Sequence, residues 1–241
     1  MRIVHSEEEL LPQFRSARSE AAKAFGIDDI FIEKYLENPK HIEVQILGDK
    51  HGNIVHLYER DCSIQRRNQK LLEETPSPAV NDEQRTKIIE LAVDAVKKIT
   101  YVGAGTMEFL LDGDGNFWFM EMNVRLQVEH CVTEMLTGFD LVKWQIRIAA
   151  GIPINFMQED VKFQGSAIEC RINAGNCGTV QMLHVPGGLS VRFDSYLVAG
   201  TEISPYYDSL LGKLIVYAKT REEALRKMKA SLCELVIDGI A

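Results

Sequence analysis

The sequence predicts an α+β fold, in which packed helices cover an antiparallel sheet and a smaller strand-rich region follows. Two apolar runs, residues 107–111 and 117–122, flank Asp-Gly-Asp-Gly-Asn, which is typical of a β-hairpin. Apolar residues recur at helical spacing after capping boxes such as Ser6 with Glu9. From Ser166 onward, short apolar runs are separated by Gly and Pro, which favours short strands.

The remaining elements follow in chain order from the same signals. The first helix begins at Ser6, packs through its apolar stripe and ends at Gly26. The turn at 49–53 joins two strands into another hairpin, and 158–164 form a linker. We expect strands at 30–35, 41–47, 54–59 and within 203–218, and further helices at 81–99, at 138–150 and after Thr220.

Composition excludes several classes of protein. A net charge of −8 and a pI near 5.3 argue against a nucleic-acid partner, which requires a basic surface. No apolar run approaches the roughly 20 residues that span a bilayer. The first residues do not resemble a signal peptide, and the five cysteines are odd in number with no Cys-x-x-Cys. We therefore expect a soluble, non-secreted protein with free thiols.

The hairpin at 107–122 places two glutamates opposite each other. If residues 113–116 form the loop, Leu111 faces Trp118, and the register then brings Glu108 opposite Glu121. Directly opposed residues have Cβ atoms about 5 Å apart on one face, so two like charges repel there. A shared proton or a divalent cation would relieve the repulsion, and oxygen ligands suit Mg²⁺ or Mn²⁺.

The residues after the hairpin alternate between polar and apolar. One alternative is a strand whose polar face simply meets water. The polar residues are, however, two carboxylates, two amides and a guanidinium with no Lys, Ser or Thr, which favours a metal-dependent anion site. The polar face comprises Glu121, Asn123, Arg125, Gln127 and Glu129, and the expected core face comprises Met120, Met122, Val124, Leu126 and Val128.

Residues 61–70 are polar and rich in Arg and Lys. Such a run is usually a solvated loop. The functional alternative is that Lys70 supplies a compact positive charge to a small anion, as lysines do in phosphate sites.

Two motifs resemble the signatures of biotin carboxylases, the ATP-grasp component of acetyl-CoA, propionyl-CoA and pyruvate carboxylases. Residues 121–134 read Glu-Met-Asn-Val-Arg-Leu-Gln-Val-Glu-His-Cys-Val-Thr-Glu, and residues 59–70 read Glu-Arg-Asp-Cys-Ser-Ile-Gln-Arg-Arg-Asn-Gln-Lys. Segments 33–41, 169–173 and 205–213 agree with the same family. The resemblance covers nearly the whole chain.

The resemblance implies a domain organisation. Residues 1–35 would be a remnant of the ATP-grasp lid subdomain, 36–160 the ATP-grasp catalytic lobe, and 165–241 a truncated biotin carboxylase C-terminal domain. The family's first domain and half of its glycine-rich lid are absent, and the region after Asn173 is shortened. No glycine-rich phosphate cradle occurs in the 241 residues, so we expect the chain alone to be inactive.

The resemblance also implies an activity, namely ATP- and bicarbonate-dependent carboxylation of biotin on a carrier protein through carboxyphosphate. The implied cofactors are ATP, two Mg²⁺ or Mn²⁺ ions and biotin. Expected partners are the biotin carboxyl carrier protein, a carboxyltransferase and a second copy in a homodimer, with no nucleic acid or membrane. Expected locations are the bacterial cytoplasm or, in a eukaryote, the mitochondrial matrix or plastid, with a role in fatty acid biosynthesis.

Carried over by motif, the catalytic residues would be Lys70, Arg125, Glu129 and Arg171. The resemblance assigns Glu129 as the general base and Arg171 to the biotin enolate, although from the sequence alone Arg171 is a strand residue in an ion pair. Likewise, His41 alone reads equally well as a surface residue. The metal ligands would be Glu108, Glu121 and Asn123; the bicarbonate contacts Lys70, Arg125, Gln127 and Val128; and the nucleotide contacts Glu33, Lys34, Tyr35, Leu36, His41, Gln65, Asn68, Glu108, Leu110 and Glu121.

The chain departs from the family pattern at three of these motif positions. Asn68 stands where the family usually has His, Val124 where it has Thr, and Cys131 where it has Pro. Two alternatives stay open: another ATP-grasp ligase of the carbamoyl phosphate synthetase type, and a non-catalytic dimerisation or scaffold fragment.

Overall fold

The structure is a computed structural model that describes residues 2–240, so the terminal residues of the first and last predicted domains, Met1 and Ala241, lie outside the described part. The chain divides into two compact units, Met1–Asn38 and Pro39–Ala241. The expected domain boundaries at 35, 160 and 165 stay a prediction. Among residues 2–240, no helix combines the length and the apolar character needed to cross a membrane.

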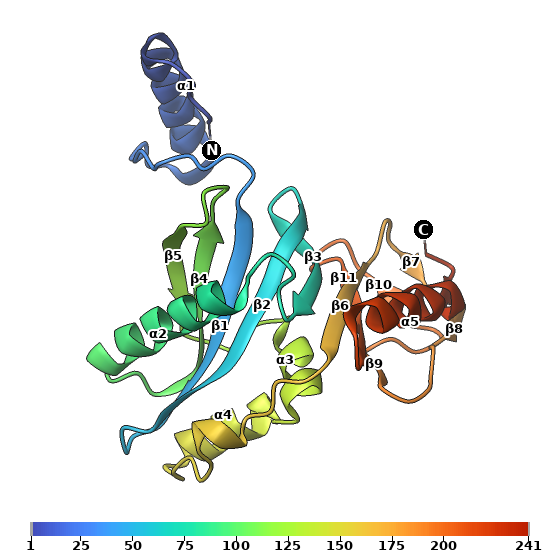
Figure 1. Ribbon diagram of the computed structural model, residues 1–241. Helices are drawn as coiled ribbons and strands as arrows, with labels where there is room; N and C mark the ends of the chain where they lie inside the picture. The colour runs from blue at the N-terminus through green and yellow to red at the C-terminus, as the bar shows by residue number, and fades with distance from the viewer. Residues whose placement is uncertain (1, 241) are drawn as a thin grey trace. The chain divides into compact units, whose positions relative to one another are not determined.

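The first unit contains a single helix, α1 (Glu7–Phe25) (Figure 1). Its bounds confirm the prediction, because it follows Ser6 and Gly26 ends it in the left-handed region at φ 72°. The predicted capping box is wrong, since the Ser6 side chain makes no capping hydrogen bond. None of its residues is buried, so the expected packed stripe is wrong for this unit. The strand expected at 30–35 is also wrong, since these residues are irregular and pair with no other strand.

The second unit is built on an eight-stranded sheet with the order β5-β4-β1-β2-β3-β6-β11-β9 (Figure 1). Every neighbouring pair is antiparallel, which confirms the α+β prediction. Two-stranded ladders β10-β7 and β12-β8 complete the C-terminal part. The sheet strands are β1 (Lys40–Gly48), β2 (Ile54–Arg66), β3 (Gln69–Thr75), β4 (Gly103–Leu111), β5 (Phe117–Asn123), β6 (Ser166–Asn173), β9 (Val191–Ser195) and β11 (Leu210–Ala218), and the short ones are β7 (Gly178–Thr179), β8 (Met182–His184), β10 (Glu202–Ile203) and β12 (Val236–Asp238).

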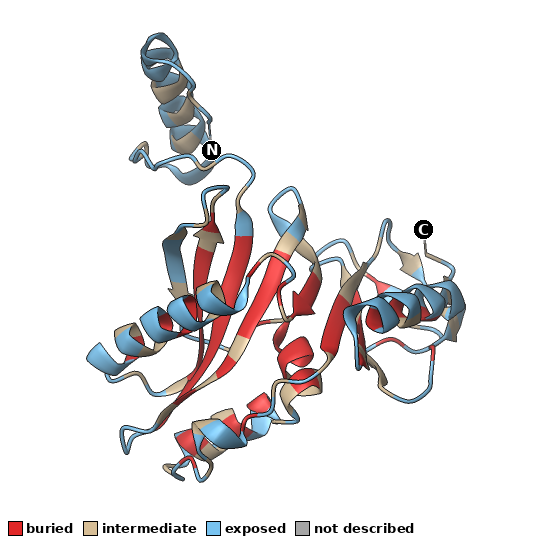
Figure 2. Ribbon diagram, in the orientation of Figure 1, coloured by how far each residue is buried: buried red, intermediate tan, exposed pale blue. Residues whose placement is uncertain are grey.

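Helices cover both faces of the sheet. Even-numbered residues of β1, such as Val44, pack against α2 (Asp82–Lys98), while Leu47 packs against α4 (Leu141–Ala149) on the other face. In Figure 2 the central strands are red along most of their length, which marks the core. The helix α5 (Arg221–Glu234) covers β11 and β6, and a single turn of 3-10 helix occupies Gln158–Asp160.

Capping decides where these helices begin and end. Asn81 and Gln84 form the predicted reciprocal box at the start of α2, and the Thr220 side chain accepts from the Glu223 amide at the start of α5. The helix expected at 138–150 begins later, because Asp140 caps it and Gly138 ends a separate helix, α3 (His130–Thr137). The sequence reading missed α3.

The strand expected at 54–59 is longer in the structure and continues into a hairpin with β3. Strand β2 continues through Arg66, and β3 begins at Gln69, so the polar run at 61–70 is mostly strand. Arg67 and Asn68 form the tight turn between them, at φ 53° and 63°. The solvated-loop interpretation of this run is therefore wrong.

The β4–β5 hairpin keeps the predicted acidic pair but not the predicted turn. Leu111 pairs with Phe117 rather than with Trp118, so residues 112–116 form the connection. A bulge between Phe109 and Glu108 adds one residue to β5, and this shift restores Glu108 opposite Glu121. The predicted pairing of the two glutamates is confirmed, although the connection is one residue longer than predicted.

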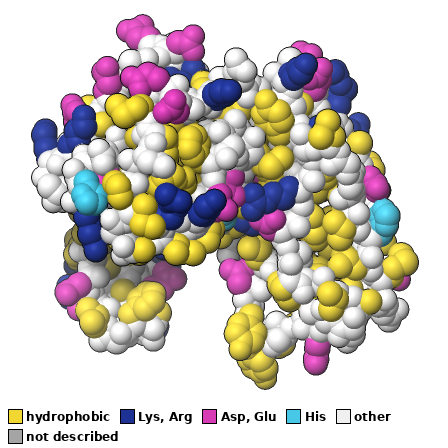
Figure 3. Space-filling model, turned by 90° about the horizontal axis from the view of Figure 1, so that it is seen from below, with side chains coloured by type: hydrophobic (Ala, Val, Ile, Leu, Met, Phe, Trp, Pro, Cys, Tyr) yellow, Lys and Arg dark blue, Asp and Glu magenta, His cyan; other side chains and the backbone are white. Residues whose placement is uncertain are grey.

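The predicted C-terminal region is joined to the preceding lobe through the sheet. Strand β6 pairs with β3 from Leu72 opposite Cys170 to Thr75 opposite Ala167. On the face shown in Figure 3, Lys and Arg side chains lie among Asp and Glu side chains and apolar ones.

Candidate functional site

A row of charged residues crosses four strands in register. Glu121 on β5 lies opposite Glu108 on β4, Glu108 lies opposite Glu43 on β1, and Glu43 lies opposite Arg60 on β2. Neighbours in such a row are about 5 Å apart, so three carboxylates stand close together. The charge must be balanced locally, and two cationic side chains do this.

The first cation is Arg60, which is fully buried. Its Nε donates to Glu43 Oε1 at 2.5 Å, and its two Nη atoms donate to four other side chains. Every nitrogen of the guanidinium therefore has an acceptor, which a buried charge requires. The Nη1 atom lies 2.7 Å from Gln45 Oε1 and 2.9 Å from Thr133 Oγ1, and the Nη2 atom lies 3.0 Å from Gln127 Oε1 and 3.2 Å from Thr106 Oγ1.

The second cation is Lys70 at the start of β3. Its Nζ lies 2.7 Å from Glu43 Oε2, 3.1 Å from Glu108 Oε1 and 2.6 Å from Glu129 Oε1. The ammonium thus uses its three hydrogens on three carboxylates that come from three segments of the chain. The tight turn between β2 and β3 brings Lys70 back over the charged row.

The Glu108 carboxylate is the centre of the predicted metal site. Its Oε1 accepts from Asn123 Nδ2 at 2.9 Å and from Gln127 Nε2 at 2.6 Å. Asn123 also donates to Glu121 Oε1 at 3.3 Å, so the two opposed glutamates share one side of the sheet. Glu121 is exposed. These carboxylates, with Glu121 open to solvent, offer the hard oxygen donors that suit Mg²⁺ or Mn²⁺.

His41 and Gln65 join the same cluster. His41 Nε2 lies 2.8 Å from Glu108 Oε2, and Gln65 Nε2 donates to His41 Nδ1 at 3.0 Å. The reading of His41 as an isolated surface residue is therefore wrong, because its side chain is nearly buried and is tied to a carboxylate.

Glu129 lies between two cations. Its Oε1 accepts from Lys70, and its Oε2 accepts from Arg171 Nη2 at 3.0 Å. Arg171 also donates through Nε to Glu73 Oε1 at 2.6 Å. The side chain of Glu129 is only 3% exposed, and both of its oxygens are directed at groups that can also bind an anion.

The local charges lower the pKa values of two of these acids, Glu43 and Glu108. Burial would raise the pKa of the Glu43 carboxyl, but Arg60 and Lys70 outweigh it and hold the pKa below its usual value. Burial likewise opposes ionisation of Glu108, yet the hydrogen bond from His41 and the charge of Lys70 lower the pKa of Glu108 to about 2. Both acids are therefore carboxylates at neutral pH.

Two further acids, Glu73 and Glu169, have raised pKa values. Glu73 and Glu169 lie directly opposite each other on β3 and β6, and both are fully buried. Burial, only partly offset by Arg171, raises the pKa of Glu73 to about 7. Burial and the neighbouring Glu73 raise the pKa of Glu169 well above its usual value.

The expected alternation ends early, and the other predicted contacts of this unit range from exposed to partly buried. Strand β5 ends at Asn123, so the alternation does not continue as a strand, and Val124 is 70% exposed instead of lying in the core. Arg125 is exposed, and its Nη1 donates to the Leu126 carbonyl at 3.3 Å. The Val128 carbonyl accepts from Lys213 Nζ at 2.8 Å. Asn68 is exposed in the turn, and Leu110 is partly buried on β4.

The remaining predicted nucleotide contacts belong to the first unit. Tyr35 is 54% exposed and Leu36 is partly buried, while Glu33 and Lys34 are exposed.

Sequence reasoning missed Glu43, Arg60 and Glu73, which hold the predicted residues together. A signal for Glu43 existed in residues 41–46, where His, Glu and Gln alternate with Ile, Val and Ile. Arg60 gave no comparable signal, because bulges in β2 interrupt its alternation.

Family comparisons agree with this geometry. Residues 1–157 match the family described as "Carbamoyl-phosphate synthase L chain, ATP binding domain". Residues 169–241 match "Biotin carboxylase C-terminal domain". The chain belongs to the biotin carboxylase family. The ATP-grasp prediction is thereby confirmed.

Two bacterial relatives are each 53% identical to the whole chain. One is the 2-oxoglutarate carboxylase small subunit of Hydrogenobacter thermophilus, compared over 248 residues, and the other is the biotin carboxylase of Haemophilus influenzae, compared over 247. The match covers 52% of the first and 55% of the second. The chain thus spans about half the length of the curated relatives it matches.

Solved structures give the same result. The biotin carboxylase domain dimer of the Hydrogenobacter thermophilus 2-oxoglutarate carboxylase, in complex with MgADP, ADP and bicarbonate, superposes with a TM-score of 0.94 at 53% identity. A Campylobacter jejuni biotin carboxylase in complex with β,γ-ATP gives 0.94 at 46% identity. Each comparison covers all of this chain and 55% of the other.

Proposed function

We propose that this chain forms the bicarbonate and metal half of a biotin carboxylase. The reaction is ATP- and bicarbonate-dependent carboxylation of biotin on a carrier protein. Because the chain spans about half the length of its relatives, we further propose that residues 1–241 have no catalytic activity by themselves. Activity would require the addition of a phosphate-binding lobe. In this proposal the whole enzyme is an ATP-dependent ligase that forms a homodimer. Its partners are the carrier protein and the carboxyltransferase, and it works in a bacterial cytoplasm or a eukaryotic organelle.

The placement of Glu129 between Lys70 and Arg171 supports this proposal above all. Both oxygens of the carboxylate accept hydrogen bonds from cations, so Glu129 lies within reach of an anion bound to the same cations and could accept its proton. The cations that hold it are also suitable for an anionic substrate. Bicarbonate bound to Lys70 would lie beside the base that deprotonates it.

The bicarbonate pocket would be completed by residues that follow the hairpin. Arg125 is exposed and unconstrained by any ion pair in the described residues, so its planar guanidinium can turn to bind the anion with two parallel hydrogen bonds. Gln127 and the Val128 backbone would add further contacts. The proton of bicarbonate would pass to a Glu129 oxygen.

Glu108, Glu121 and Asn123 would hold the two Mg²⁺ or Mn²⁺ ions, which neutralise phosphate charge when nucleotide is bound. His41 and Gln65 would contact the nucleotide next to Glu108, with Asn68 and Leu110 at the edge of the same surface. Glu33, Lys34, Tyr35 and Leu36 would supply the adenine contacts from the first unit. Arg171, held by Glu73, would stabilise the enolate of biotin after it loses its N–H proton.

The experiment measures bicarbonate-dependent ATP hydrolysis with free biotin. We expect no activity from residues 1–241 alone, and activity after fusion to the front half of the Haemophilus influenzae relative. In that fusion, Glu129→Gln should lower kcat by at least about 10²-fold, because the amide keeps the shape but cannot accept the proton.

The matched control is Glu90→Gln, which changes an exposed glutamate on α2 and should leave kcat unchanged. Full activity in the Glu129→Gln fusion would refute the assigned base. A correctly folded fusion that hydrolyses no ATP would instead favour the scaffold alternative.

A further inference from the structure

A cluster of three metal-ligating side chains lies at the start of α3, outside the charged row. His130 and Glu134 are one helical turn apart, so they lie on the same face of the helix. Cys131 Sγ lies 3.6 Å from His130 Nε2, and His130 Nε2 lies 3.9 Å from Glu134 Oε2. All three ligand atoms lie within 4.8 Å of one another, as the ligands of one ion do.

The imidazole is oriented for ligation. His130 Nδ1 lies 2.8 Å from the Gln127 carbonyl, so Nδ1 carries the proton and donates it. Nε2 then carries the lone pair, and it lies nearer Cys131 Sγ than Nδ1 does, at 3.6 Å against 3.9 Å. Metal-bound histidines show this arrangement, in which the second nitrogen donates to a backbone carbonyl.

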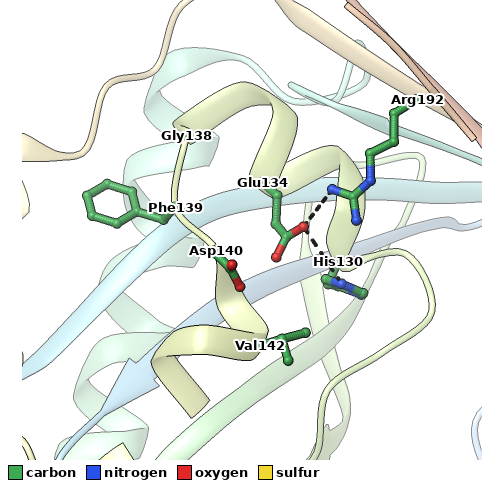
Figure 4. Close-up of a pocket in the computed structure, with 7 residues that line it drawn as sticks. All are labelled: His130, Glu134, Gly138, Phe139, Asp140, Val142 and Arg192. Atoms are coloured by element: carbon green, nitrogen blue, oxygen red, sulfur yellow. Dashed lines mark hydrogen bonds and ion pairs between the residues drawn. The ribbon is translucent and has the colours of Figure 1, made fainter. Parts of the chain in front are cut away.

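The carboxylate is also fixed. Glu134 Oε1 accepts from the Leu141 amide at 2.7 Å, while Oε2 accepts from Arg192 Nη1 at 2.7 Å. Figure 4 shows the Glu134 carboxylate between His130 and Arg192, with dashed lines to both. One oxygen is thus held by backbone, and the other faces the histidine.

Charges around the thiol decide how an ion would bind. Cys131 Sγ lies 2.8 Å from Lys213 Nζ and 3.2 Å from Asp194 Oδ2. The thiol donates to this carboxylate, so it carries a proton that a bound cation must displace. Lys213 also donates to the Val128 carbonyl and can keep this bond when it leaves the sulfur. A bound cation would therefore replace the thiol proton and compete with Lys213 and Arg192.

Two residues of the cluster, His130 and Glu134, line a pocket of about 420 Å³ that gives an ion access to them from solvent. His130, Glu134, Asp140 and Arg192 line it, together with Gly138, Phe139 and Val142. The pocket has room for water to fill a fourth ligand position.

We propose that His130, Cys131 and Glu134 form a binding site for Zn²⁺, with a water molecule from the pocket as the fourth ligand. Zn²⁺ accepts this mixture of thiolate, imidazole and carboxylate in tetrahedral geometry. The site includes Cys131, which stands where the related signature has Pro. It does not depend on the proposed activity.

The test is calorimetric titration of the full chain with Zn²⁺. We expect one ion per chain and release of the thiol proton, seen as a heat that changes with the ionisation enthalpy of the buffer. Co²⁺ should bind at the same place and give a thiolate-to-cobalt charge-transfer band. Cys131→Ser and Glu134→Gln should each weaken Zn²⁺ binding at least about tenfold, and Cys131→Ser should abolish the cobalt band.

The matched control is Cys177→Ser, which removes an exposed cysteine outside the cluster and should bind Zn²⁺ as the wild type does. The cluster of His41, Glu43 and Glu108 could also take an ion, but without any contribution from Cys131. Circular dichroism verifies that each variant is folded. Equal Zn²⁺ affinity in wild type and folded Cys131→Ser, or a Co²⁺ complex without the thiolate band, would overturn the proposal.

Discussion

At the scale of single residues, Arg60 determines the polar interior of the sheet. It carries a charge with no exposed surface, and its three nitrogens donate to five side chains. We expect Arg60→Ala to lower the free energy of unfolding by about 3–5 kcal/mol, because Glu43 would remain buried with a weakened partner set. Urea denaturation followed by circular dichroism measures this change.

Arg60→Lys is the informative comparison, since it keeps the charge but loses the fork of donors. It should recover only part of the lost stability. Lys87→Ala, on the exposed side of α2, should change the free energy of unfolding by less than about 0.5 kcal/mol. A tolerated Arg60→Ala would mean that the hydrogen-bonded network contributes little to folding.

Glu73 makes stability depend on pH. Its carboxyl has a pKa of about 7 in the folded protein and 4.5 as its ordinary value, because burial outweighs the attraction of Arg171. The folded state therefore binds this proton more tightly than the unfolded state does. The contribution to stability is fully present below pH 4.5 and is lost as the pH rises through about 7.

Glu73→Gln should remove the part of this dependence that Glu73 contributes, while the buried Glu169, whose pKa is also raised, keeps its own part. Between pH 5 and pH 8, the wild type should lose about 2 kcal/mol more of unfolding free energy than the variant does, at 1.36 kcal/mol per pKa unit. Urea midpoints at both pH values provide the measurement. Parallel pH profiles for the two proteins would show that Glu73 is not the titrating group.

At the scale of elements, the start of α2 depends on two reciprocal hydrogen bonds. The Asn81 side chain accepts from the Gln84 amide at 2.9 Å, and the Gln84 side chain accepts from the Asn81 amide at 3.1 Å. Asn81→Ala should lower the free energy of unfolding by about 1 kcal/mol, because it leaves a helix N–H without its acceptor. Chemical denaturation measures this effect.

Asn81→Ser provides the matched control, since a hydroxyl can replace the amide oxygen as acceptor at this position. It should retain most of the stability. Equal losses in the two variants would assign the effect to packing of the first turn and not to the cap.

The β4–β5 hairpin explains why an element can be predicted while its register is not. Asp112 Oδ1 accepts from the backbone amides of Asp114 and Asn116, and this turn lengthens the connection by one residue relative to the predicted loop. The bulge before Glu121 compensates. Turn lengths and bulges depend on local hydrogen bonds that the hydrophobic pattern does not encode.

At the scale of the whole molecule, the clusters of buried apolar side chains found among residues 2–240 all lie in the second unit. The five clusters of buried apolar side chains lie within residues 42–240, and none of the α1 residues is buried. Residues 39–241 expressed alone should therefore fold with the same urea midpoint as the full chain. Removing α5 instead should lower the midpoint, since Ala224 and Met228 pack against β11. A lower midpoint for 39–241 would show that the first unit contributes to stability.

The helices and the central hairpins could be predicted because caps and apolar periodicity act locally. The helix α3 escaped prediction, since its buried face includes His130 and Thr133 as well as apolar residues. The strand at 30–35 was predicted from apolar content alone, although a strand needs a neighbour to accept its backbone hydrogen bonds.

The candidate site could be predicted only where its contacts follow from local sequence order. Residues adjacent in sequence or across one hairpin, such as Glu108 with Glu121, follow from alternation and register. Contacts across several strands, such as Lys70 with Glu43 or Arg171 with Glu129, depend on the strand order of the sheet. The motif resemblance named Lys70, Glu129 and Arg171, but only the fold shows that Glu43 and Glu73 hold them.

The ladder between β3 and β6 has a consequence for proteolysis. Four residue pairs, from Leu72 with Cys170 to Thr75 with Ala167, join the ATP-grasp lobe to the C-terminal strands. A protease cut in the connection at 158–164 would break the covalent link but leave this ladder intact, so the two pieces would stay associated. Pulling them apart would expose two unpaired strand edges, which template aggregation. The pairing of β3 with β6 therefore keeps Lys70 and Arg171 at a fixed spacing even when the backbone between them is cut.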